Sequence, residues 1–158
     1  MNRLRITSAL ALAAAAVIGL AATAAAGDFV PLKGIFVGDV THTTIDSTHD
    51  RVDINASGTA ALLGHFNLDV PHVVDRTTRT AVGSYQFTAA SGDTLYAEFT
   101  GQATPTDMPG ILYIEEKATI MGGTGRFAGA TGSFIAERWY DIAAGKTVSY
   151  FDGTIAWH

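Results

Sequence analysis

The chain has 158 residues, 47% of them hydrophobic, with 10 basic and 15 acidic side chains and no cysteine. The absence of cysteine excludes disulfides, thiol catalysis and cysteine-ligated metal. The acidic balance and the lack of any Lys/Arg cluster argue against nucleic acid and anionic membranes as partners, because both reward clustered positive charge.

The first 26 residues have the three-part plan of a secretory signal peptide. Arg3 and Arg5 form a short basic region, residues 9–20 are an unbroken apolar run, and residues 24–26 offer an Ala-x-Ala cleavage pattern. The alternative is a retained anchor, but the run is short for a bilayer span, which needs about 20 apolar residues. We therefore expect cleavage near Ala26, a secreted or periplasmic protein, and no stable membrane insertion afterwards.

Without the two leader arginines, the exported residues 27–158 carry 8 basic and 15 acidic side chains, a net charge of −7. Their length fits a single domain with a sizeable core. Such a chain without disulfides must rely on a continuous core for its stability.

The exported part has no long stretch of apolar residues at helical spacing. Short runs rich in Thr, Val, Ile, Tyr and Phe predict strands at 32–44, 51–56, 59–66, 68–75, 80–89, 94–103, 110–120, 132–142 and 147–157. Turn residues lie at 56–58, 90–93 and 143–146. Eight or nine antiparallel strands close into a barrel or fold into a sandwich, because closure removes exposed edges. The prediction is an all-β, calycin-like antiparallel barrel of about eight strands.

Two late strands each carry one charge on an otherwise apolar face. The even positions from 112 to 120 are apolar except Glu116, and those from 134 to 142 are apolar except Arg138. If these strands are antiparallel neighbours, the carboxylate and the guanidinium can meet, and buried charges need one another because an unpaired one is costly.

The two charges have three interpretations, namely an outward-facing row, a structural ion bridge, and a charged group inside a cavity. For the cavity, the candidate catalytic residues are Glu116, Arg138, Tyr150 and Tyr113. The candidate ligand-binding residues are Glu116, Arg138, Tyr140, Phe134 and Tyr150.

The histidines lack the alternating spacing of a metal centre. His42 and His49 lie in the polar segment 41–51, which we interpret as a solvated loop, with a loose His/Asp metal cluster as the alternative. His65 and His72 are interpreted as a surface pair. We therefore expect no metal and no cofactor.

Residues 122–132 contain five glycines. A phosphate loop needs Gly-Lys-Ser/Thr feeding a long helix, whereas this segment has no lysine and is followed by another strand-like run. We interpret it as a strand-to-strand connection with several positive-φ residues and with Phe127 as an apolar plug.

This run, Gly-Gly-Thr-Gly-Arg-Phe-x-Gly-Ala-x-Gly, is similar to the segment that joins late strands of allene oxide cyclase-like and dirigent-like barrels. Gly-Asp-Thr-Leu-Tyr at 92–96 and Phe-Thr-Gly at 99–101 suit the secreted bacterial members of that group. The resemblance covers roughly residues 83–155 and implies an eight-stranded antiparallel barrel with an apolar cavity. In the plant relatives it implies cofactor-free steering of a reactive small molecule, and often homo-oligomers.

The chain departs from the plant cyclases, which carry a glutamate in the first strand and a cysteine in the cavity. Here Asp39 is the only acid in 32–44, and the chain has no cysteine. No catalytic residue of the cyclases therefore carries over. The favoured function is a secreted barrel that binds a small hydrophobic molecule or acts as a non-catalytic envelope or extracellular module. The alternative is a cofactor-independent isomerase or cyclase.

Overall fold

Eight long strands with alternating side chains build the protein. The computed structural model describes residues 27–157, and the expected signal peptide lies outside the described residues. The strands are β1 (Val30–Thr44), β2 (His49–Ala60), β3 (Gly64–Asp75), β4 (Thr80–Ala89), β5 (Thr94–Pro105), β6 (Ile111–Gly123), β7 (Thr131–Asp141) and β8 (Lys146–Ala156). A single turn of 3-10 helix, η1 (Gly125–Phe127), lies between β6 and β7.

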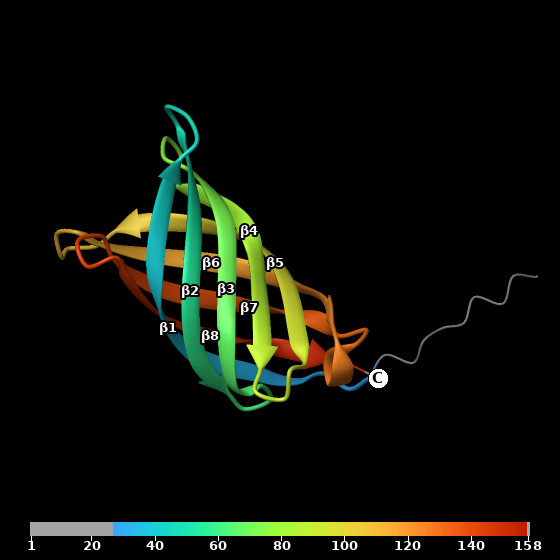
Figure 1. Ribbon diagram of the computed structural model, residues 1–158. Coiled ribbons are helices and arrows are strands. Elements are labelled where there is room, and N and C mark those ends of the chain that lie inside the picture. Colours follow the sequence, from blue (N-terminus) through green and yellow to red (C-terminus); the bar gives the residue numbers. More distant parts are fainter. Residues whose placement is uncertain (1–26, 158) are drawn as a thin grey trace, which may run out of the picture.

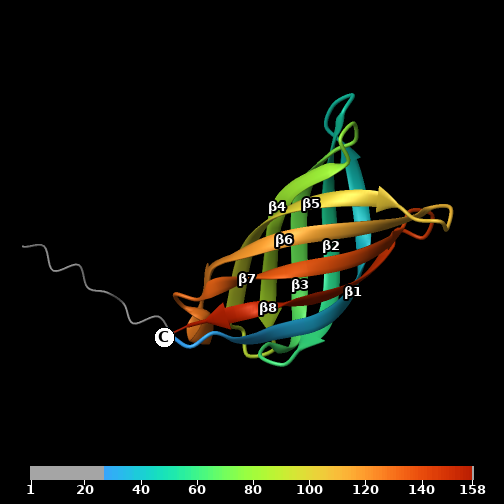
Figure 2. The same cartoon turned by 180° about the vertical axis from the view of Figure 1, so that it is seen from behind.

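The sheet closes on itself. Each strand pairs antiparallel with its neighbours in sequence, and β8 pairs with β1. Figures 1 and 2 show the two walls of this closed barrel from opposite sides. The all-β class and the eight-stranded antiparallel barrel are confirmed, and closure leaves no open sheet edge. Residues 27–157 include no helix long and apolar enough to cross a lipid bilayer.

The predicted turn at 56–58 is wrong. β2 runs without a break from His49 to Ala60, and the connection to β3 follows at 61–63. Gly58 is there for packing, because a Cβ on it would overlap the carbonyl oxygen of Ile35 and the ring of Phe66. A Ser-Gly pair in a strand was therefore misread as a turn signal, since glycine also marks close approach of neighbouring groups.

The interior is filled mainly by aromatic rings. Tyr85 stacks on Phe87 with ring centroids 5.7 Å apart and meets Phe134 edge-to-face at 5.2 Å. Further buried rings complete this cluster, namely Phe36, Phe66, Phe99 and Phe151. Eight strands enclose a space that side chains can just fill, which is what this core does.

The glycine-rich segment closes one end of the barrel. Phe127 is buried there and contacts Trp157 edge-to-face, with centroids 6.1 Å apart. Four glycines of the segment adopt positive φ, as predicted for a strand connection: Gly122, Gly125, Gly129 and Gly132. In Figure 1 the segment lies next to the C-terminal end of the described chain. The other end of the barrel is formed by the hairpins at 45–48, 76–79, 106–110 and 142–145; we call it the mouth.

Candidate functional site

Glu116 and Arg138 form an ion pair inside the barrel. Their exposed fractions are 0% and 2%. Arg138 donates from Nη2 to Glu116 Oε1 at 2.7 Å and from Nε to Oε2 at 3.4 Å. The prediction that they pair is confirmed in this form, but they are diagonal neighbours, because Ala136 lies opposite Glu116 and Ile114 lies opposite Arg138.

A third group completes this buried cluster. The hydroxyl of Tyr85, on β4, donates a short hydrogen bond to Glu116 Oε2. Burial raises the pKa of Tyr85 well above its usual value, and the nearby Glu116 charge raises it further. Burial tends to lower the pKa of Arg138, but attraction to Glu116 outweighs it and the pKa rises. Tyr85 therefore stays a protonated donor, and Arg138 stays a cation.

The Glu116 carboxylate is fully engaged. It accepts hydrogen bonds from Arg138 Nε, Arg138 Nη2 and the Tyr85 hydroxyl. A general base needs an oxygen that faces the proton it removes. Glu116 has the geometry of a structural ion bridge, which is the interpretation that the structure favours.

A cavity of about 80 Å³ lies between this ion pair and the mouth. Its apolar walls come from six strands: Val40, Val52, Val74, Ala81, Ala103, Leu112 and Ile114. Its polar groups are Arg138 and the largely buried His72 and Tyr140, together with the exposed His42 and Arg79 at the mouth. The cavity is thus an apolar cup with cationic and imidazole groups at its inner side.

His72 is buried, and its interpretation as a surface partner of His65 is wrong. Side chains alternate along β3, so His65 faces outward while His72 is only 5% exposed. The Nδ1 atom lies 2.9 Å from the carbonyl oxygen of Val70, which can only accept, so Nδ1 carries the proton. Burial lowers the pKa of His72, and Arg138 lowers it further. In the neutral ring, Nε2 is therefore an acceptor.

A stacked pair lies at the rim of the cavity. His42 Nε2 is 3.0 Å from the Tyr140 hydroxyl, and the two rings stack with centroids 5.7 Å apart. His49, by contrast, is the first residue of β2, next to the exposed hairpin at 45–48, with its Nδ1 atom 3.1 Å from Asp46 Oδ1. Nowhere in residues 27–157 do three or more His, Asp or Glu side chains gather as a metal site would require.

The remaining candidates lie away from the cavity. Tyr150 and Tyr113 are on the outer wall, because the inward positions beside them are taken by Ser149 and Ile114. The Tyr113 hydroxyl donates to Glu137 Oε1 at 2.8 Å, and this bond raises the pKa of Tyr113 to about 12. The structure therefore does not bring either tyrosine to Glu116 and Arg138.

Phe134 is inside but belongs to the aromatic core. Its ring packs on Tyr85, Phe87 and Phe151 and is not part of the cavity lining. Of the predicted site residues, Arg138 and Tyr140 line the cavity, and Glu116 holds Arg138 in place.

Sequence reasoning missed Tyr85 and misread His72 as a surface residue. Tyr85 lies in the row Ala81, Gly83, Tyr85, Phe87 and Ala89, which has the period of a strand and a single hydroxyl. A lone polar group on an apolar row is the same signal that identified Glu116 and Arg138. His72 lies likewise among Phe66, Leu68 and Val70 on one face of β3.

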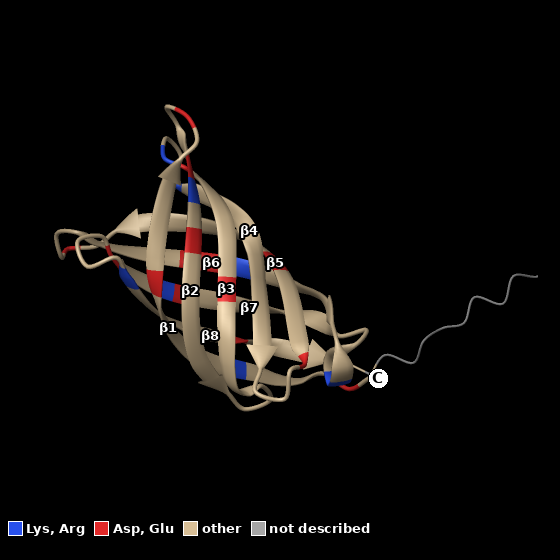
Figure 3. Ribbon diagram, in the orientation of Figure 1, with Lys and Arg blue, Asp and Glu red and all other residues tan. Residues whose placement is uncertain are grey.

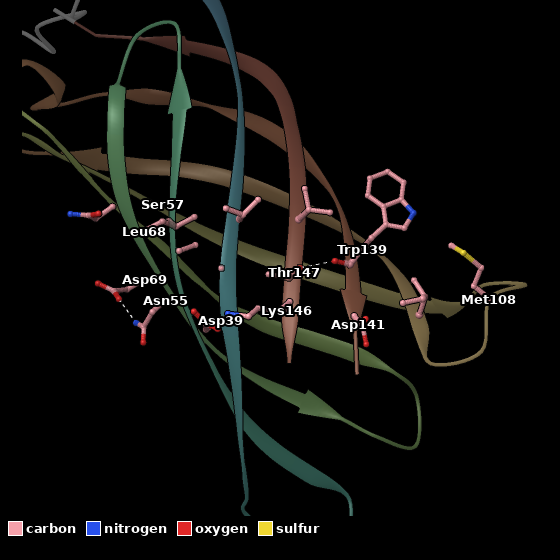
Figure 4. A pocket seen from close by; sticks show the side chains of 16 residues that line it. Asp39, Asn55, Ser57, Leu68, Asp69, Met108, Trp139, Asp141, Lys146 and Thr147 are labelled. Carbon is pink, nitrogen blue, oxygen red and sulfur yellow. Dashed lines mark hydrogen bonds and ion pairs between the residues drawn. The ribbon is translucent and has the colours of Figure 1, made fainter. Parts of the chain in front are cut away.

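A larger hollow of the described surface lies outside the barrel. It has a volume of about 970 Å³ and is lined by residues of β1, β2, β3, β6, β7 and β8 and by Met108 of the 106–110 hairpin. Figure 4 shows the Asp39–Lys146 ion pair and the Asn55–Asp69 hydrogen bond in it, with Trp139 and Met108 farther along. The charged side chains of this outer hollow are not buried, whereas Arg138 and His72 of the smaller mouth cavity are. For that reason we take the mouth cavity as the candidate site.

The closed barrel has a dirigent-like, allene oxide cyclase-like fold. A similar solved structure is that of the pterocarpan synthase dirigent protein GePTS1, with a TM-score of 0.56 over 83% of this chain and 86% of that chain. The two are 14% identical, so the likeness concerns the fold alone. No model of a known protein family and no curated protein matches the chain.

Proposed function

We propose that the protein is a binding protein that holds the hydroxyl-bearing end of a small apolar molecule in the mouth cavity. The observation that carries this proposal is the buried His72, whose Nε2 acceptor borders an apolar cup. No hydrogen bond joins Nε2 to another residue in the described range 27–157. Nε2 is open to the cavity rather than sealed, because among the described residues only Asp50 Oδ1 is a fully buried side-chain oxygen or nitrogen without a partner. A ligand donor that enters the cup can therefore bond to it.

The chemistry of the cup favours a hydroxyl group. Arg138 uses Nε and Nη2 for Glu116, so Nη1 is available as a donor beside the His72 acceptor. A hydroxyl can donate to one and accept from the other. The surrounding valine, alanine, leucine and isoleucine side chains favour an apolar body next to it.

The size of the cup limits how much of the ligand enters. A cavity of about 80 Å³ is smaller than the roughly 150 Å³ void that holds benzene in an engineered core. We expect one end of the molecule to enter and the rest to project past the exposed His42 and Arg79. The carboxylate of Glu116 positions Arg138 through their two hydrogen bonds.

Phenol and toluene make a matched pair of probes, since they have similar shapes and only phenol carries a hydroxyl. We expect phenol to shift the NMR signals of the cavity residues Ile114, Tyr140 and His72 at lower concentration than toluene. His72→Phe removes the acceptor and should abolish the preference for phenol, while Ala81→Leu fills the cup and should abolish binding of both.

Binding is also expected to depend on pH. Because the pKa of His72 lies below its usual value of 6.5, the ring is neutral and accepting at pH 7. Phenol affinity should hold as pH falls toward 6.5 and be lost below it, as the pH passes through the lowered pKa of His72. Equal binding of phenol and toluene, no binding of phenol, or a phenol preference unchanged in His72→Phe would each contradict the proposal.

A further inference from the structure

Strands β1 and β8 carry the same pattern on the outer wall. Residues 33–39 read Lys-x-Ile-x-Val-x-Asp, and residues 146–152 read Lys-x-Val-x-Tyr-x-Asp. The side chains shown as x are glycines or are buried on the inner side of the wall. Because the two strands are antiparallel neighbours, the two copies of the pattern run side by side in opposite directions.

The register turns this pattern into four cross-strand pairs. They are Lys33–Asp152, Ile35–Tyr150, Val37–Val148 and Asp39–Lys146, and we call their eight residues the β1–β8 face. Both lysines are 63% exposed and both aspartates 66%. The face therefore has a local twofold axis perpendicular to the wall, and that axis exchanges Lys33 with Lys146 and Asp39 with Asp152.

The centre of the face is apolar and exposed. Val37 and Tyr150 are each 55% exposed. Trp139, opposite Val148, and Ile135, opposite Asp152, extend the apolar surface onto β7. An apolar centre with a charged rim is the anatomy of a protein–protein interface. Figure 3 shows that acidic and basic positions are interspersed over the wall, as they are at the corners of this face.

The four corner charges make the face complementary to itself. Their signs alternate around the rim, since each lysine has an aspartate beside it on the neighbouring strand and another on its own strand. When a second copy is turned by 180° about an axis in the plane of the face, every lysine comes to lie opposite an aspartate. A twofold interface sets the same patch of both copies together, so it needs this kind of self-complementarity.

The shape of the wall selects the direction of the axis. The outer hollow includes Val37, Asp39, Lys146 and Val148 and does not include Lys33 or Asp152. One end of the face is thus hollowed and the other is not. An axis across the strands places the unhollowed end of each copy against the hollowed end of the other.

We propose that the protein forms a homodimer through the β1–β8 face, with a twofold axis that lies in the wall and crosses the strands. Lys33 then faces the partner's Asp39, and Asp152 faces the partner's Lys146. Burial of the apolar centre drives association, because exposed ion pairs by themselves contribute little. The corner charges fix which face and which register the two copies adopt.

Charge reversal gives a direct test. In Lys33→Asp/Lys146→Asp the face carries four acids, and in Asp39→Lys/Asp152→Lys it carries four bases. We expect the wild-type protein to sediment as a dimer. Each variant alone should have a dimer Kd raised at least about 100-fold, because like charges meet at every corner. Mixed one to one, the two variants should form a heterodimer, seen by native mass spectrometry.

Arg51→Asp/Lys117→Asp is the matched control, since it makes the same charge change on the outer wall away from the face. It should dimerise like the wild type. A wild-type protein that is monomeric throughout the concentration series, or trimeric, overturns the proposal. So does a dimer that survives either face variant, or a mixture that does not associate. Circular dichroism confirms that each variant keeps the barrel.

The chain has no cysteine, so single cysteines report the direction of the axis. Under mild oxidation, a mixture of Lys33→Cys and Asp39→Cys proteins should form a disulfide-linked heterodimer in high yield. A mixture of Lys33→Cys and Asp152→Cys proteins should not. The reverse result assigns the axis along the strands, and a low yield in both mixtures contradicts the face.

Discussion

At the scale of single residues, the buried Glu116, Arg138 and Tyr85 stabilise one another through their ion pair and hydrogen bonds. Taking either charge out of water is expensive, and only the other charge compensates for it at this depth. The tyrosine hydroxyl donates a further hydrogen bond to Glu116 Oε2, which also accepts from Arg138 Nε. Such a cluster fixes how β4, β6 and β7 lie relative to each other, because its three members come from those strands.

Removing one member of the ion pair should therefore cost more than removing both. Arg138→Met leaves a carboxylate buried without its cation, and Glu116→Gln leaves a cation without its carboxylate. Each single change should lower the free energy of unfolding by about 3–5 kcal/mol. In the double variant Tyr85 still has an amide oxygen to donate to, so most of that loss should be recovered.

Denaturant unfolding of the four proteins measures this coupling. The cycle has a matched reference in Arg51→Met/Asp53→Asn, which removes an exposed ion pair of the outer wall and should change stability little. Additive losses at Glu116 and Arg138 would show that the two side chains do not depend on one another.

The sequence predicted part of this site, because some of its residues interrupt the regular alternation of apolar positions along a strand. Glu116 and Arg138 were found because each interrupts an apolar row of period two, a signal that depends on local spacing alone. Tyr113 and Tyr150 were misplaced because they were chosen by chemistry, although strand parity turns them outward. The diagonal offset of the ion pair depends on the register between β6 and β7, which local spacing does not determine.

At the scale of elements, the connection between β6 and β7 does more than join two strands. Its helical turn carries Phe127 into the end of the barrel, and its glycines allow the backbone to approach β8 closely. Most strand bounds were predicted within a few residues, but the connection at 61–63 fell inside the predicted strand 59–66, although Gly64 beside it lies in open space. The turn predicted at 56–58 is absent, because the glycine there serves packing between strands, a tertiary cause that the sequence pattern does not reveal.

Two glycines, Gly129 in this connection and Gly132 in β7, differ in how closely other groups approach them. Gly132 and Gly129 both have positive φ, but a Cβ on Gly132 would overlap the carbonyl oxygen of Thr154, while one on Gly129 would meet open space. Gly129→Ala should cost about 1–2 kcal/mol from φ alone. Gly132→Ala should cost at least about 2 kcal/mol more.

Thermal or denaturant unfolding measures the difference between these two variants. Equal losses would mean that the strand pair of β7 and β8 yields to the added methyl group and that close approach is unimportant there. A smaller loss for Gly132→Ala would contradict the register of β7 against β8 at this position.

At the scale of the whole molecule, closure of the barrel brings the two ends of the described chain together. Val30 at the start of β1 lies opposite Ile155 near the end of β8. Every strand thus has two neighbours, and the first and last strands are as well paired as the central ones. Because every strand is paired on both sides, the chain could begin and end at a different connection and keep the same strand pairs.

A circular permutant should therefore fold. Joining residue 157 to residue 27 by a short glycine linker and opening the chain in the 106–110 hairpin leaves every strand pair intact. We expect native-like circular dichroism and cooperative unfolding at a somewhat lower temperature. Opening the chain inside β6, between Glu116 and Lys117, is the matched control and should give no cooperative transition. Failure of the hairpin permutant would mean that the order of strand formation is fixed.

The pairing of β8 with β1 also determines when, during folding, the last open strand edge is covered. Until then, that edge can pair with another chain and aggregate. The two edges of β1 have partners at different distances in sequence, since β2 follows directly whereas β8 is the last strand. Until β8 pairs, one edge of β1 stays open. An unpaired edge is a template for other chains, and charged side chains on it are a common protection. Lys33 and Asp39 lie on β1 on either side of Ile35 and Val37, where charged side chains disfavour pairing of the open edge with another chain.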